Sequence, residues 1–166
     1  MEITTLDSFL GYYENLRART LRVIAAIPPN EIEWSPTTGK WSLGDIIRHI
    51  AGIERYMYAE TVSGRPSRYT GCGRDLADGF DATLAYMNGL HAESMDMFRA
   101  LTPEQLHGKC MTPAGSPITT WKWLRAMLEH EIHHRGQIYT YLGILGVTTP
   151  PLYGLTSELV AAKAAR

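Results

Sequence analysis

Hydrophobic residues recur at steps of three and four residues in four long stretches of this chain, which is the spacing of amphipathic helices. The stretches cover about residues 4–27, 42–62, 78–101 and 118–145. Ser42, with Asp45 three residues later, predicts an N-cap and an acidic first turn for the second helix. Gly146 predicts the C-cap of the fourth helix. Four helices of this length predict an all-α fold, a four-helix bundle.

The connections between these stretches are rich in proline, glycine and polar residues, as long loops are. They cover residues 28–41, 63–78 and 110–117. The loop over residues 63–78 could border a pocket. We expect an extended segment over residues 150–154, and then a short C-terminal helix capped by Ser157. No stretch alternates apolar and polar residues as a strand does. We therefore expect one domain over residues 1–166, with long loops that allow a topology other than up-down-up-down.

Composition narrows the class of protein. A chain of 166 residues, 45% hydrophobic and 20% charged, is long enough to bury roughly two-thirds of its unfolded surface. The formal net charge of -1 gives no electrostatic footprint for nucleic acid or for an anionic membrane. No stretch approaches 18 apolar residues, and the first residues do not resemble a signal peptide. Cys72 and Cys110 have no paired spacing and suit free thiols, so we expect a cytoplasmic protein.

Three of the six histidines lie in the stretch Glu129–Gln137, within the fourth predicted helix. At about 100° per residue, His130 and His134 lie about 40° apart, on the face that carries the apolar residues. A buried imidazole must satisfy both ring nitrogens, and two charged rings one turn apart repel each other. A divalent cation uses one nitrogen of each neutral ring. The pair therefore predicts a metal site in preference to a hydrogen-bonded core pair.

A third ligand is needed, because open catalytic sites usually have three protein ligands. His49 and His91 both lie on apolar stripes, and spacing alone does not separate them. His107 and His133 are expected to be partly exposed. Glu60 shares the stripe of His49 but lies three turns away, too far for direct ligation.

Residues His130 to His134 also satisfy the short zinc-protease pattern, with Glu131 as the general base. Such a protease needs a third ligand downstream and a strand in its cleft. The chain offers only Glu158 near its end and no evident strand, so the protease is the least favoured alternative. We expect Glu131 to be a solvated or interface carboxylate.

The phrase from Glu129 to Tyr139, a histidine followed after three residues by His-Arg-Gly-Gln, closely resembles the motif of the DinB-like superfamily of metal-binding four-helix bundles. The phrase from Trp41 to Ile50 resembles the family's second helix, in which a histidine is the third ligand. The resemblance implies His49, His130 and His134 as the ligands and gives His91 no such role. It also implies a homodimer, and the family name records a link to DNA damage that implies no contact with DNA.

Three neutral imidazoles suit Zn, Ni, Fe or Co and argue against Mg or Ca. Members of the family include transferases and isomerases that use low-molecular-weight thiols. The resemblance therefore implies a metal-dependent thiol S-transferase that acts on a small electrophile, and the alternative is a non-enzymatic metal-binding protein of the stress response. We expect Gln137 to contact water or substrate at the site, although a role in helix packing is equally compatible with its position.

Overall fold

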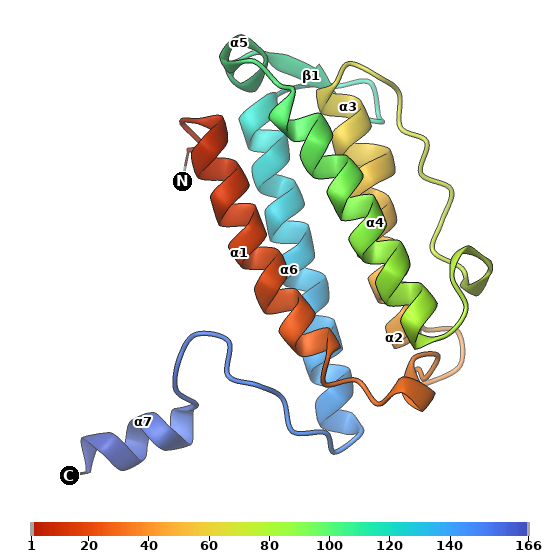
Figure 1. The fold of residues 1–166 in the computed structure, drawn as a ribbon, viewed down its shortest axis with the longest axis vertical. Helices are drawn as coiled ribbons and strands as arrows, with labels where there is room; N and C mark the ends of the chain where they lie inside the picture. Colours follow the sequence, from red (N-terminus) through yellow and green to blue (C-terminus); the bar gives the residue numbers. More distant parts are fainter. Residues whose placement is uncertain (1, 166) are drawn as a thin grey trace.

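The computed structural model describes residues 2–165, and its main body is a bundle of four long helical segments (Figure 1). They are α1 (Leu6–Ile24), a second segment made of α2 (Leu43–Ile53), the π-helix η2 (Glu54–Ala59) and α3 (Glu60–Val62), then α4 (Phe80–Arg99) and α6 (Thr120–Ile144). The predicted all-α four-helix bundle is confirmed. Each segment also lies within the stretch that the hydrophobic pattern predicted.

The order of the helices around the bundle differs from their order in the chain. α1 packs against α6 and α4, and α2 packs against α4 and α6. Figure 1 shows that the chain runs one way along α1, returns along α2 to α3, runs in that same direction along α4, and reverses along α6. The second segment and α4 are thus parallel, which is possible because residues 63–79 carry the chain back along the side of the bundle. The topology is therefore not up-down-up-down.

The start of α2 is set by a reciprocal cap. The Oγ of Ser42 accepts a hydrogen bond from the backbone N–H of Asp45 at 3.0 Å, and the Asp45 carboxylate accepts one from the backbone N–H of Ser42 at 2.9 Å. These bonds satisfy donors that a helix end leaves free. The predicted N-cap is confirmed, and it places His49 about two turns inside the helix.

The smaller elements correct two expectations. A short helix α5 (Pro103–His107) leads into an antiparallel hairpin of β1 (Lys109–Met111) and β2 (Pro117–Thr119). The prediction of a chain without strands was wrong, because strands of three residues are too short to show alternation. The short C-terminal helix is confirmed as α7 (Ser157–Ala164), which lies apart from the bundle in Figure 1. Its N-cap is Thr156 and not Ser157. Two 3-10 turns, η1 (Pro29–Glu31) and η3 (Arg74–Leu76), lie in the loops.

Two groups of buried apolar side chains fill the bundle, one toward each end. Phe9, Phe98 and Leu124 belong to one group, and Ile24, Ile47 and Leu142 to the other. Along α1 and α6, the buried residues between the two groups are polar and include Arg17, Glu131 and His134. The candidate site lies at this level of the bundle. None of the helices within residues 2–165 has the length and apolar character needed to cross a membrane.

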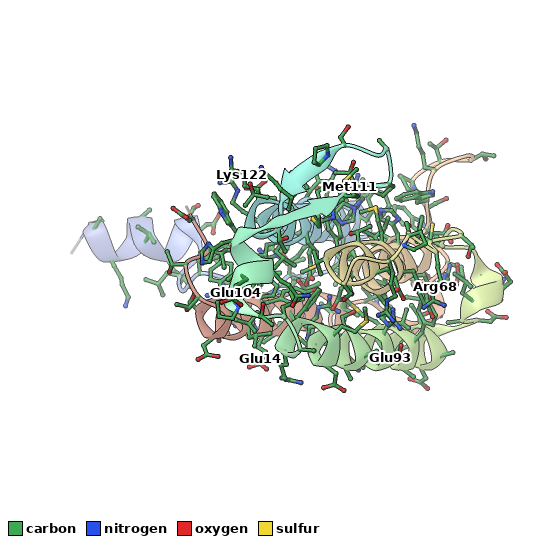
Figure 2. The ribbon with its side chains drawn as sticks, turned by 90° about the horizontal axis from the view of Figure 1, so that it is seen from above. Glu14, Arg68, Glu93, Glu104, Met111 and Lys122 are labelled. Carbon is green, nitrogen blue, oxygen red and sulfur yellow. The ribbon has the colours of Figure 1, made fainter. Side chains whose placement is uncertain are left out.

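The outer faces of the helices are charged. Seen along the bundle in Figure 2, Glu14 of α1 and Glu93 of α4 lie on one outer side, and Lys122 of α6 lies on the opposite side. This distribution is that of amphipathic helices around an apolar interior.

Candidate metal centre

Three histidine side chains meet between α2 and α6. The Nε2 atom of His130 lies 3.0 Å from Nε2 of His49 and 3.0 Å from Nε2 of His134. All three ligand atoms lie within 4.8 Å of one another. His130 and His134 are one turn apart on α6. The contact between α2 and α6 brings His49 to them, although 81 positions of sequence separate His49 from His130. The structure thus gathers the three residues that the sequence analysis proposed as ligands.

The opposite ring nitrogens of two of these histidines are held by oxygen atoms. Nδ1 of His134 lies 2.6 Å from Oε1 of Gln137, and Nδ1 of His49 lies 2.7 Å from the hydroxyl of Tyr69. An amide oxygen only accepts hydrogen bonds, so His134 carries a proton on Nδ1, and the same assignment suits His49 beside Tyr69. The Nε2 lone pairs of both rings therefore face the common point, as in histidines that bind metals.

Burial keeps these imidazoles neutral. It lowers the pKa of His49 to about 4, with a smaller effect from a charge on His134. It lowers the pKa of His130 to about 3, assisted by the neighbouring histidines. The pKa of His134 is also lowered by burial, against the opposing effect of its bond to Gln137. At pH 7 the rings are neutral donors, which is the form that binds a metal ion.

The donor set fits a divalent transition metal. Nε2 of His130 faces two Nε2 acceptors, and a single N–H on it points at no more than one of them. Protons alone therefore leave lone pairs opposed at 3.0 Å, whereas one cation satisfies all three. Imidazole nitrogen suits Zn, Ni and Fe and does not suit Mg or Ca.

Trp41 forms the edge of the site. Its ring centre lies 4.6 Å from that of His49 and 5.9 Å from that of His134, and 42% of the residue is exposed. A cavity of about 230 Å³ opens beside it, lined by Gly39, Lys40, Trp41, Ile46, Gln137 and Tyr141. Because Gln137 also contacts His134, this cavity adjoins the histidine cluster. A small molecule in the cavity would lie beside the three histidines.

The other histidines lie elsewhere. Nδ1 of His91 is 2.8 Å from Oε1 of Glu54, and the His91 ring packs edge-on against Tyr13. His107 and His133 are exposed, as the sequence analysis expected. His107 contacts the backbone oxygen of Thr4, whereas the ring of His133 lies 5.0 Å from that of His134.

Glu131 occupies a buried ion-pair network, so the expectation of a solvated or interface carboxylate was wrong. The residue is 2% exposed, and both of its carboxylate oxygens accept hydrogen bonds from Arg17, at 3.1 and 2.8 Å. Arg17 also pairs with Glu54 and lies within hydrogen-bond distance of the Tyr13 hydroxyl. A carboxylate held by Arg17 in this way cannot act as a general base that activates water at the three histidines. The geometry therefore removes the argument for a zinc protease.

Sequence reasoning missed the side chains that support the site. Tyr69 lies in the loop that was expected to border a pocket, and no periodicity marks single residues in a loop. Glu60 is 1% exposed and pairs with Arg55, Arg65 and Arg68. The backbone N–H of Arg68 also donates a hydrogen bond to the carbonyl of Tyr56. The loop that carries Tyr69 is therefore held one residue before Tyr69. An arginine-rich loop that follows a helical glutamate is the one signal that could have been noticed.

The second segment runs parallel to α4, and three histidines converge between α2 and α6. These features define a four-helix bundle that is not up-down-up-down and that contains a candidate metal site. A model of the DinB superfamily matches residues 12–138, and the chain belongs to this superfamily. The resemblance read from the sequence motifs is thereby confirmed.

Relatives and solved structures share the fold at low identity. YjoA of Bacillus subtilis, an uncharacterized protein, is 22% identical over 151 residues, which cover 89% of this chain and 95% of YjoA. The structure of a DinB-like protein from Bacillus cereus is similar with a TM-score of 0.76 and 16% identity, over 90% of this chain and 99% of that one. YfiT of Bacillus subtilis, described as a probable metal-dependent hydrolase with an unusual four-helix bundle topology, has a TM-score of 0.69 at 16% identity, over 89% and 91%.

Proposed function

We propose that this chain is a divalent-metal-dependent enzyme that transfers a small thiol to an electrophile, with His49, His130 and His134 as the metal ligands. The observation that carries the proposal is the convergence of three Nε2 atoms beside an open cavity. The choice of a thiol is supported by the resemblance of the His-Arg-Gly-Gln motif and of the second helix to family members that use small thiols. Residues 1–166 form one catalytic domain in this proposal.

The metal, Zn, Ni or Fe, supplies when bound a Lewis acid that lowers the pKa of a thiol at neutral pH. Transfer then forms a sulfur–carbon bond and breaks the bond from that carbon to its leaving group, which departs with the electron pair, while the thiol proton passes to solvent. The chain's own residues orient the site. Tyr69 and Gln137 hold the rings of His49 and His134, and Trp41 offers an apolar wall for the electrophile.

A second candidate is hydrolysis, in which water replaces the thiol. YfiT is described as a probable metal-dependent hydrolase and shares the fold. The same donor set serves both reactions, because a Lewis acid also lowers the pKa of water. A non-enzymatic metal-binding protein of the stress response uses the same ligands without turnover. A homodimer is part of the preferred proposal and rests on the family resemblance. A cytoplasmic location is also part of it and rests on the composition and on the two cysteines without paired spacing.

Metal content and thiol consumption test this proposal. The purified protein should hold one transition-metal ion per chain, measured by elemental analysis. His49→Ala and His130→Ala should lose it, whereas His91→Ala, whose side chain contacts Glu54, should keep it. Full occupancy in the His49 or His130 variant contradicts the ligand assignment.

The metal-loaded protein should then consume a small thiol in the presence of an alkylating electrophile, faster than the His130→Ala variant. Hydrolysis of an activated amide or ester without any thiol would favour the second candidate. A metal-loaded protein that is inert in both assays would indicate the binding protein.

A further inference from the structure

The cavity beside Trp41 has an unusual chemical lining. Its six lining residues include one cation, Lys40, and no aspartate or glutamate. The carboxylates near the start of α2 are already engaged, because Glu33 and Asp45 both pair with Arg48. Lys40 has no ion-pair or hydrogen-bond partner for its side chain among residues 2–165. The cavity therefore contains a positive charge that the described protein does not neutralise.

The backbone around Lys40 positions this exposed residue beside the cavity. The N–H of Lys40 donates to the carbonyl of Thr37 at 3.2 Å, and Gly39 between them takes a φ of 79°, a conformation that L side chains rarely adopt. Trp41 follows directly and packs on His49 and His134, and Ser42 then caps α2. Lys40 is thus attached between a closed turn and a ring that touches two of the metal ligands.

The opposite wall supplies a hydrogen-bond donor. Oε1 of Gln137 is occupied by Nδ1 of His134, so the group that this side chain can still offer is its amide N–H₂. Tyr141 adds a hydroxyl to the lining, while Ile46 and the face of Trp41 are apolar. The neutral triad contributes no negative charge, and a divalent ion held there would add positive charge.

We propose that this cavity binds a small carboxylate, with Lys40 as its counter-ion, the Gln137 amide as a hydrogen-bond donor, and Trp41 against its hydrocarbon part. A volume of about 230 Å³ lies below the range of about 300–1,000 Å³ for drug-sized ligands, so the ligand is a short-chain acid. One lysine suits a monoanion, whereas phosphate sites commonly use arginine forks or several backbone amides. The inference rests on the proposed function and deepens it, because it makes the electrophile a small molecule that carries a carboxylate.

Binding of matched probes tests the inference without any turnover. Butyrate and butyramide have nearly the same shape and differ in charge. Their affinities for the metal-free protein and for the zinc-loaded protein are measured by ligand-observed NMR and calorimetry, with inorganic phosphate as a third probe. We expect both forms to prefer butyrate to butyramide by about tenfold, as for a hydrogen-bonded ion pair. Phosphate should bind more weakly than butyrate.

Variants at two lysines distinguish binding at Lys40 from a general attraction of anions to a positively charged surface. Lys40→Met should reduce the preference for butyrate to less than about threefold, and Lys40→Arg should retain it. Lys122→Met, which removes an exposed lysine on the outer face of α6 (Figure 2), should change nothing. Metal content should be the same in all three variants, because none of them changes a proposed ligand.

The outcomes also distinguish this inference from the proposed function. A butyrate preference that persists in the metal-free protein but disappears in Lys40→Met supports the inference, even if no thiol is ever transferred. A preference that requires zinc and survives Lys40→Met overturns it and leaves the metal site intact. Equal binding of butyrate and butyramide, or tighter binding of phosphate, also overturns it.

Discussion

Two buried polar clusters lie at mid-height in this bundle, and they differ in how their buried polar groups are paired. In the network of Arg17, Glu54 and Glu131, the guanidinium contacts both carboxylates, and each of the three residues is at most 3% exposed. In the histidine cluster, three imidazole rings face one another, and none of the three has a carboxylate partner within residues 2–165.

The difference shows which of the two clusters has the donor atoms of a candidate metal site. Opposite charges that bond to each other largely satisfy themselves, although burying them has a large desolvation cost. Nitrogen atoms that all accept hydrogen bonds cannot satisfy one another, and burial only keeps the three imidazoles neutral. The histidine cluster also opens on a cavity and has an exposed tryptophan at its edge, whereas the ion-pair network is enclosed by all four helical segments. The histidine cluster therefore suits chemistry, and the ion-pair network suits stability.

The largest effect should come from breaking the enclosed network. Arg17→Met removes the cation and leaves two buried carboxylates without their partner, which should lower the free energy of unfolding by about 3–5 kcal/mol. Urea denaturation of the metal-free protein measures it. Arg99→Met is the matched control. Its guanidinium pairs with Asp96 and Glu14 on the surface, so its loss should cost about 1 kcal/mol or less. Equal costs for the two variants would contradict the contrast between the clusters.

Breaking the histidine cluster should remove the response to metal. At a metal concentration 100 times its Kd, the wild-type protein should gain about 2.7 kcal/mol in free energy of unfolding, and His130→Ala should gain none. His130→Ala removes no charge, because burial holds the pKa of His130 at about 3, so its metal-free stability should fall by less than that of Arg17→Met. His91→Ala should retain the full gain. Denaturation with and without added zinc gives all three values.

The sequence predicted the elements that have a regular hydrophobic period. The periodic stripes gave the four helices, and the pair Ser42 and Asp45 gave the start of α2. The hairpin of β1 and β2 was missed because strands of three residues have no detectable period. The π-helix η2 was missed as well, because one wide turn inside a helix shifts the register by about one residue and leaves the apolar pattern almost unchanged.

At the site, spacing gave His130 and His134, because both lie on one helix. His49 could not be chosen over His91 by spacing, since each lies alone on its own helix, and the choice depended on the family resemblance. The partner of Glu131 was beyond prediction for a similar reason. Arg17 lies 114 positions away, and only the packing of α1 against α6 brings the two together.

A smaller effect should follow from loosening the rings without removing a ligand. Tyr69→Phe deletes the hydroxyl that holds Nδ1 of His49 and should weaken metal binding by about 10–100-fold, the range for partners that orient metal ligands. Competition with a chromophoric chelator measures the metal Kd. Tyr86→Phe, another half-buried tyrosine close to the same loop, should leave the Kd within about twofold. A Tyr69→Phe protein that binds metal like the wild type would limit Tyr69 to packing.

The smallest effect should appear in the pH dependence of the enclosed network. Burial raises the pKa of Glu54, but Arg17 and the hydrogen bond from His91 together outweigh burial and hold this pKa below its ordinary value. Glu54 therefore stabilises the fold above about pH 4.5, the ordinary value, and this contribution is lost as the pH falls through the folded pKa. The slope of unfolding free energy against pH reflects at most one proton for this group, or about 1.4 kcal/mol per pH unit.

In Glu54→Gln the slope of unfolding free energy below pH 4.5 should be shallower by up to that amount. The slope should stay positive, because the pKa values of Glu33, Asp45 and Glu60 are also lowered. Urea denaturation between pH 5 and pH 3 measures both slopes. An unchanged slope would mean that Glu54 keeps its ordinary pKa, and the network would then not be the charge-compensated counterpart of the histidine cluster.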